Sequence, residues 1–119
     1  MPITIYHNPR CSKSRKTLEL IEKQGISPTV VRYLEEPPGG DRIRELAATI
    51  GVPVSDLLRR NEDEFRNADD LPDLADDAAL AAWLALHPRV MQRPIVIDDD
   101  AGVAIVGRPP ENVREILPS

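Results

Sequence analysis

The single cysteine of the chain stands where a reactive thiol is expected. Cys11 follows the turn signal His7-Asn8-Pro9 and comes directly before a stretch with helical spacing of apolar residues. Free backbone N–H groups and the positive end of the dipole at a helix amino terminus stabilise a thiolate. Arg10, Lys13 and Arg15 add positive charge within one turn. The pattern predicts a pKa for Cys11 below about 8.5, in the range of roughly 3.5–7.5 found for catalytic cysteines at helix ends.

The same features attract an oxyanion, because they offer N–H donors, cations and the small polar residues Ser12 and Ser14. The alternative is a buried structural cysteine, but such residues lie in apolar runs and the neighbours of Cys11 are polar or charged. One cysteine excludes an internal disulfide and a cysteine-rich zinc site. A redox cycle at Cys11 would therefore need an external thiol.

Length and composition indicate one domain over residues 1–119, with 41% hydrophobic and 29% charged residues. A net charge of −5 argues against general binding to nucleic acid or acidic membranes. No apolar run approaches the roughly 20 residues that span a bilayer, and no secretory signal is visible. We expect a cytoplasmic monomer without a bound metal or organic cofactor.

Hydrophobic patterning places Cys11 between a strand and a helix. Strands are predicted at 3–6 and 29–34, with a helix at 12–24 between them, which implies a parallel pair joined by a right-handed crossover. A helix capped by Asp41 and ending at Ile50 follows, and then a short helix capped by Ser55.

The second half of the chain changes period twice. An acidic surface stretch at 61–73 precedes a helix that begins at Asp76 or Asp77 and ends before His87. Strands at 94–97 and 103–106 form a hairpin whose solvated tip includes Asp98–Asp100, and Pro109-Pro110 opens a last helix at 111–117. The predicted class is α/β, in the order βαβ, helical block, ββα.

The run from His7 to Arg15, HNPRCSKSR, resembles the active-site loop of the ArsC family, the glutaredoxin-linked arsenate reductases, and most of all the branch that contains the YfgD proteins. The likeness extends along the chain in order. It includes Tyr33-Leu34, Pro37-Pro38, Leu57-Leu58-Arg59, His87-Pro88, Arg93-Pro94-Ile95-Val96 and Gly107-Arg108-Pro109-Pro110. The resemblance implies a thioredoxin-like fold with a helical insertion, a mixed sheet flanked by helices, and a cis peptide bond before Pro94.

The resemblance also implies roles for particular residues. Cys11 matches the nucleophile, and His7 matches a loop histidine that assists thiol ionisation. Three arginines match those that hold the anion, together with polar residues of the loop; the set is Arg59, Arg93, Arg108, Ser12, Ser14 and Arg15. Arg60 is an adjacent rival of Arg59, and Arg89 is expected to be a surface charge. Ser12-Lys13 departs from the Gly-Thr pair common in this loop, which alters the anion cradle.

By this resemblance the protein is an arsenate reductase in arsenic detoxification, with glutathione as co-substrate and glutaredoxin as partner. Two alternatives remain open. A monothiol oxidoreductase acting on glutathione mixed disulfides could use the Cys11-x-x-Ser14 arrangement. An Spx-like regulator that binds RNA polymerase would carry a second cysteine where Ser14 stands.

Overall fold

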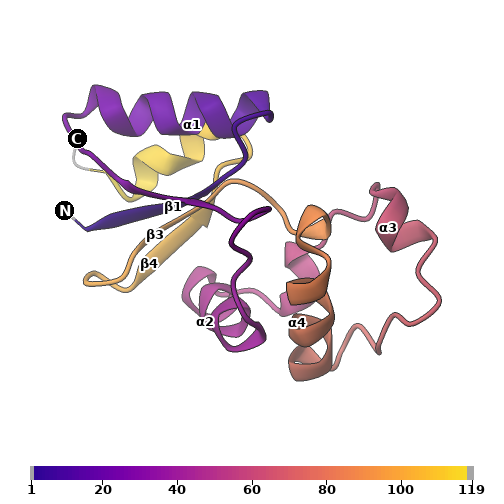
Figure 1. Ribbon diagram of the computed structural model, residues 1–119. Helices are drawn as coiled ribbons and strands as arrows, with labels where there is room; N and C mark the ends of the chain where they lie inside the picture. Colours follow the sequence, from indigo (N-terminus) through magenta and orange to yellow (C-terminus); the bar gives the residue numbers. More distant parts are fainter. Residues whose placement is uncertain (1, 118–119) are drawn as a thin grey trace. The chain divides into compact units, whose positions relative to one another are not determined.

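A four-stranded mixed sheet forms the centre of the part of the chain that carries Cys11 (Figure 1). The computed structural model describes residues 2–117. The strands are β1 (Ile3–His7), β2 (Thr29–Arg32), β3 (Ile95–Asp98) and β4 (Val103–Val106), in the spatial order β2-β1-β3-β4. β1 pairs in parallel with β2 and antiparallel with β3, which pairs antiparallel with β4. The predicted parallel crossover and C-terminal hairpin are confirmed.

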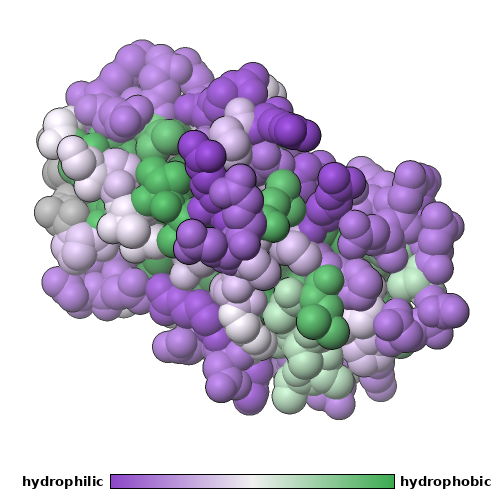
Figure 2. All heavy atoms as spheres, in the orientation of Figure 1, coloured by the Kyte–Doolittle hydropathy of each residue, from purple (hydrophilic) through white to green (hydrophobic). Residues whose placement is uncertain are grey.

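Two helices pack beside each other on one face of this sheet (Figure 1). They are α1 (Ser12–Lys23) and the 3₁₀ helix η3 (Pro110–Glu115). Their apolar residues, those of β1 and β3, and Leu117 after η3 form one core, made of Ile3, Ile5, Leu20, Ile21, Val96, Val113 and Leu117. Hydrophilic side chains cover the outer side of α1 (Figure 2). Because a helix of 12 residues is marginal alone in water, this buried stripe is what keeps α1 folded.

Residues 37–92 form a second compact unit, distinct from the unit made of the sheet, α1 and η3. It contains α2 (Gly40–Ile50), η1 (Val54–Leu57), α3 (Asp63–Arg66), α4 (Asp77–Leu86) and η2 (Pro88–Val90). α2 packs closely on α4, since a Cβ atom at Gly40 would lie 3.3 Å from the backbone nitrogen of Ala82. One domain over the whole chain stays a prediction. Across residues 2–117, no helix has the length and apolar character needed to cross a membrane.

Several predicted boundaries in the first half are wrong. The second strand ends at Arg32 rather than at residue 34, because the N–H groups of Glu35 and Glu36 both donate to the Arg32 carbonyl and start a turn. Gly39, not Asp41, is the N-cap of α2, and Asp41 lies in the first turn, where its charge still suits the dipole. Pro53 likewise precedes η1, with Ser55 inside the helix.

In the second half, Asp76 caps α4 as predicted, since its carboxylate accepts a hydrogen bond from Ala79 N–H. The last helix is a 3₁₀ helix over Pro110–Glu115 instead of 111–117, with Pro110 in its first turn. Asp98 is not part of a solvated tip. It is 4% exposed at the end of β3 and accepts a hydrogen bond from Ala101 N–H, so only Asp99 and Asp100 face solvent.

Candidate active site

Cys11 is the N-cap residue of α1, as the sequence predicts. Its N–H donates to the Asn8 carbonyl at 3.0 Å, and its own carbonyl accepts from Arg15 N–H at 3.0 Å. Backbone hydrogen bonds on both sides therefore fix the residue in the loop between β1 and α1. The first turn of α1 holds no acidic residue, so no carboxylate of that turn offsets the positive helix end near the thiol.

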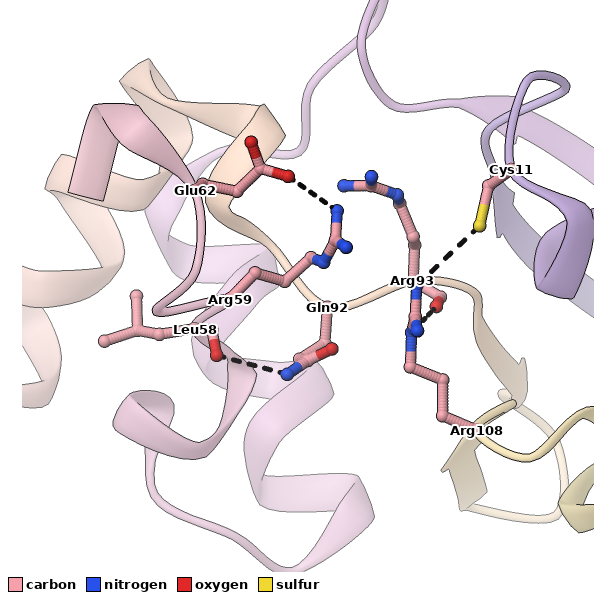
Figure 3. A network of polar contacts seen from close by, with 7 residues as sticks. All are labelled: Cys11, Leu58, Arg59, Glu62, Gln92, Arg93 and Arg108. Carbon is pink, nitrogen blue, oxygen red and sulfur yellow. Dashed lines mark hydrogen bonds and ion pairs between the residues drawn. The ribbon is translucent and has the colours of Figure 1, made fainter. Parts of the chain in front are cut away.

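The ends of the C-terminal hairpin bring two arginines to this loop. Arg108 follows β4, and its Nη2 lies 3.7 Å from the Cys11 sulfur (Figure 3). Its Nε donates to the Arg93 carbonyl at 2.7 Å, so the backbone that precedes β3 holds the guanidinium in place. Gly107 N–H also donates to the Pro94 carbonyl at 2.8 Å. Residues 93 and 108, far apart in sequence, thus meet at the sheet edge that carries Cys11.

Both arginines precede cis peptide bonds, Arg93–Pro94 and Arg108–Pro109. The first confirms the cis-proline that the family resemblance implies. The second was not predicted.

Opposing effects set the pKa of Cys11. Burial is the largest single effect, and it acts to raise the pKa of the thiol. Hydrogen bonds from the backbone N–H of Ser14, the side chain of Arg93 and the backbone N–H of Lys13 stabilise the thiolate, and the charge of Arg108 adds to them. Together these interactions outweigh burial, so the pKa lies below its ordinary value. A larger share of Cys11 is therefore thiolate at a given pH than in a cysteine with the ordinary pKa, and the thiolate is the nucleophilic form.

His7 contacts the serine of the loop. Its Nδ1 lies 2.6 Å from the Ser14 hydroxyl, which also accepts a hydrogen bond from Asn8 N–H at 3.1 Å. Burial, followed by the charges of Arg32 and Arg15, lowers the pKa of His7 below its usual value, so the imidazole is neutral near pH 7. The route from His7 to the thiol runs through Ser14, whose backbone N–H bonds the sulfur.

The other two loop residues of the predicted set differ in their contacts. Arg15 donates from Nη1 to the Pro9 carbonyl at 2.9 Å, so its guanidinium stabilises the loop between β1 and α1. Ser12 is exposed as the first residue of α1. Their part in holding an anion stays a prediction.

Arg59 lies in the second unit. Its backbone N–H donates to the Val90 carbonyl at 2.6 Å, and its Nη1 forms an ion pair with Glu62 at 2.7 Å (Figure 3). Its rival Arg60 is exposed, as is Arg89. The role of Arg59 in anion binding stays a prediction.

α4 ends before His87, as predicted, and His87 is its C-cap residue. The His87 ring stacks on Trp83 with centroids 4.2 Å apart, and its Nδ1 lies 3.2 Å from Glu64 Oε2. Among residues 2–117, no group of three or more His, Cys, Asp or Glu side chains is placed to hold a metal ion.

Three residues shape the site although the sequence predicted no role for them there. Asn8 shapes the loop, because its Oδ1 accepts from Arg10 N–H at 3.0 Å while its carbonyl accepts from Cys11 N–H. An Asn-Pro pair is a known signal for such a turn. Gly107 approaches Thr17 of α1 so closely that a Cβ atom on it would lie 2.6 Å from Thr17 Oγ1. An isolated glycine at the end of a strand often marks a close approach of backbone, which could have identified Gly107.

A mixed sheet built from βαβ and ββ units, with a lone cysteine at the amino end of the first helix, defines a protein of the thioredoxin-like α/β class. The family model described as "ArsC family" matches residues 6–116. The chain belongs to the ArsC family.

Individual relatives agree with this assignment. The chain is 40% identical to the uncharacterised protein YfgD of Escherichia coli strain K12 over 97% of this chain and 96% of that protein. It is 42% identical to an arsenate reductase of the same strain, over 98% of this chain and 81% of that protein. A solved structure of an arsenate reductase from Vibrio cholerae is 43% identical, covers 98% of each chain, and superposes with a TM-score of 0.86. The predicted family and the thioredoxin-like fold are confirmed.

Proposed function

We propose that this protein is an arsenate reductase that uses the Cys11 thiolate as its nucleophile. The observation that carries the proposal is the placement of Arg93 and Arg108 at Cys11, with Arg108 Nη2 at 3.7 Å from the sulfur. Planar guanidinium groups bind tetrahedral oxyanions through paired hydrogen bonds, so an arsenate beside the sulfur would find donors suited to it. The names of close relatives support arsenate as the substrate.

In the proposed reaction, the Cys11 sulfur attacks arsenic, a bond from sulfur to arsenic forms, and one oxygen leaves as water after protonation. Arg93 and Arg108 stabilise the charge that develops on the remaining oxygens. Ser14 and Lys13 hold the sulfur as thiolate through their backbone N–H groups before the attack. His7, neutral and bonded to Ser14, keeps this part of the loop in position.

Reduction of arsenic from the +5 to the +3 state needs two electrons. Two thiols supply them when they are oxidised to a disulfide, and the chain has only one cysteine. We propose glutathione as the second thiol: its sulfur attacks the Cys11 sulfur, the sulfur–arsenic bond breaks with its electron pair staying on arsenic, and arsenite leaves. Glutaredoxin then reduces the mixed disulfide between Cys11 and glutathione, which regenerates the Cys11 thiolate. This assignment rests on the family resemblance and on the lone thiol. We propose that the protein works as a cytoplasmic monomer, in a compartment that keeps thiols reduced.

The test is NADPH consumption with glutathione, glutaredoxin and glutathione reductase supplied, measured with and without arsenate. The proposal expects consumption that depends on arsenate and is lost in Cys11→Ser, which replaces sulfur by oxygen with little change in volume. Arsenate-dependent turnover in Cys11→Ser would contradict Cys11 as the nucleophile. Equal consumption with and without arsenate in the wild type, on a glutathione mixed disulfide, would favour the monothiol oxidoreductase instead.

The arrangement of Ser14 bears on the regulatory alternative. Its side chain is fully buried and hydrogen-bonded to His7, so this position serves the structure of the loop. A disulfide switch within the loop would need a thiol there. This observation favours an enzyme over an Spx-like redox regulator.

A further inference from the structure

Gly107 lies at a point where no other residue fits without movement. It follows β4 and precedes Arg108. A Cβ atom placed on it would lie 2.6 Å from Thr17 Oγ1, 2.8 Å from Pro94 Cγ and 3.1 Å from Thr17 Cγ2. Contacts below about 3.0 Å to a carbon are repulsive, so the strand end approaches α1 this closely only because glycine has no side chain.

Both neighbours of Gly107 belong to elements that hold the thiol and its arginines. Thr17 is fully buried, and its hydroxyl donates to the Lys13 carbonyl at 2.8 Å. Lys13 lies in the first turn of α1, and its N–H is one of the donors to the Cys11 sulfur. Pro94 follows Arg93 directly and accepts the Gly107 N–H at 2.8 Å.

We propose that Gly107 and Thr17 are positioning residues: their close contact sets the distance between Arg108 and the Cys11 sulfur. The contact joins α1, at Thr17 in its second turn, to the chain that carries Arg108, so a shift at Gly107 is passed to the next residue. The Nη2–Sγ distance of 3.7 Å leaves little room, since a further displacement of about 1 Å would break the interaction. The effect on arsenate turnover rests on the proposed function, whereas the effect on the thiol does not.

The principal test is Gly107→Ala, followed by the pH profile of Cys11 alkylation with a neutral reagent and by arsenate kcat/KM. As Arg108 moves away, the inflection of the alkylation profile should shift upward toward the free-thiol value of about 8.5. Arsenate kcat/KM should fall about ten- to a hundred-fold, as expected when a binding group is displaced by about 1 Å. Circular dichroism establishes that the variant is folded.

Gly39→Ala is the matched control. Gly39 has φ −72°, and a Cβ there meets no atom within 4 Å, so this variant should keep the wild-type inflection and kcat/KM. A folded Gly107→Ala protein with a wild-type inflection and wild-type kcat/KM would overturn the proposal.

A second substitution should partly restore the properties that Gly107→Ala loses. Thr17→Ala removes two of the three atoms that a Cβ at residue 107 would meet, so Gly107→Ala/Thr17→Ala should recover part of both losses. Thr17→Ala alone should shift the inflection upward by less than Gly107→Ala, because the contact is loosened and the Lys13 bond is lost. If Gly107→Ala does not fold and Thr17→Ala behaves as wild type in both assays, the proposal is wrong. If the wild type does not reduce arsenate, the proposed function fails, and the alkylation profiles alone decide the positioning role.

Discussion

Cys11 owes its reactivity to donors that lie on different parts of the chain. Burial of the sulfur works against ionisation, while Ser14, Arg93, Lys13 and Arg108 work for it. Two of these donors are backbone groups of the first turn of α1, which any residues there would supply. The other two are side chains from the ends of the terminal hairpin, and they distinguish this thiol from an ordinary helix-terminal cysteine.

The first prediction concerns the titration of Cys11. Only the thiolate reacts with alkylating agents, so the rate rises as pH rises through the pKa of the folded protein. Because the pKa of Cys11 is lowered, the inflection should fall below about 8.5, the ordinary thiol value. The rate of alkylation by iodoacetamide between pH 5 and 10 measures it. An inflection at or above that value would exclude a stabilised thiolate.

The second prediction concerns the geometry of the arginines. Arg93→Lys and Arg108→Lys each keep the positive charge and lose the planar guanidinium group. Arg108→Lys also removes the hydrogen bond from Arg108 Nε to the Arg93 carbonyl. A charged hydrogen bond contributes roughly 1.5–3 kcal/mol, so arsenate kcat/KM should fall about ten- to a hundred-fold for each change. The alkylation rate should fall much less.

Arg114→Lys, an exposed position on η3, provides the control and should change neither quantity. Equal losses in turnover and alkylation would mean that Arg93 and Arg108 act on the thiol alone. Wild-type behaviour of both lysine variants would show that they are ordinary surface charges.

At the scale of the element, the loop between β1 and α1 depends on a neutral histidine. The pKa of His7 is lowered mainly by burial, so protonation is easier in the unfolded chain than in the folded one. Stability should therefore fall as pH drops through about 6.5, the ordinary value for histidine, until the lower folded-state pKa is reached.

The third prediction follows from this loss of stability as the pH falls. In His7→Asn the amide can still bond Ser14 and cannot titrate, so the fall in stability below about pH 6.5 should be smaller than in the wild type. Urea unfolding at intervals from pH 5 to 7.5 measures the two slopes. The idea fails if wild type and variant lose stability in parallel over this range.

The fourth prediction concerns Asp98 in the hairpin of β3 and β4. Asp98 is buried and accepts the Ala101 N–H at 3.1 Å, so Asp98→Ala should cost about 1–2 kcal/mol of unfolding free energy by leaving that donor without its partner. Asp98→Asn keeps an oxygen acceptor and should cost less. The exposed Asp100→Ala should stay within about 0.5 kcal/mol of the wild type. Chemical denaturation ranks the three, and a ranking with Asp100→Ala lowest in stability would contradict the assignment.

At the scale of the whole molecule, the net charge and the local charge have opposite signs. The chain carries −5 overall, yet Arg10, Lys13, Arg93 and Arg108 surround or adjoin Cys11 without an acidic residue in the first turn of α1. An anionic substrate responds to the local field rather than to the total. A site for an oxyanion is thus compatible with an acidic protein.

The fifth prediction tests whether the second unit contributes to anion binding. Arg59 is not among the groups that lower the pKa of Cys11, so Arg59→Lys should leave the alkylation profile unchanged. If Arg59 holds the anion, arsenate kcat/KM should still fall about ten-fold, the cost of one weakened charged hydrogen bond. Arg60→Lys, at the exposed neighbouring position, is the control. Identical kinetics in the two variants would remove Arg59 from the site.

The sequence by itself determined the order of the elements and the position of Cys11 at the start of a helix. Local patterns such as the β-branched run before His7, the helical spacing after Ser12 and the Asp76 cap depend on near neighbours, and each appears in the structure. A cysteine at a helix start is also a local feature. One error falls where a tertiary contact acts against local preference: Asp98 looks like part of a polar tip and is buried at the end of β3.

Only the tertiary structure decided which arginines meet the thiol. Arg93, Arg108 and Cys11 come together because β1 and β4 both flank β3 in the sheet, and strand pairing is a long-range property that no spacing records. The route from His7 through Ser14 appeared in the same way, since the resemblance implied a role without a contact. The need for glycine at residue 107 depends on Thr17 and Pro94, which approach it from other elements. Close packing between distant segments decides such positions, because excluded volume acts only between atoms that the fold has brought into contact.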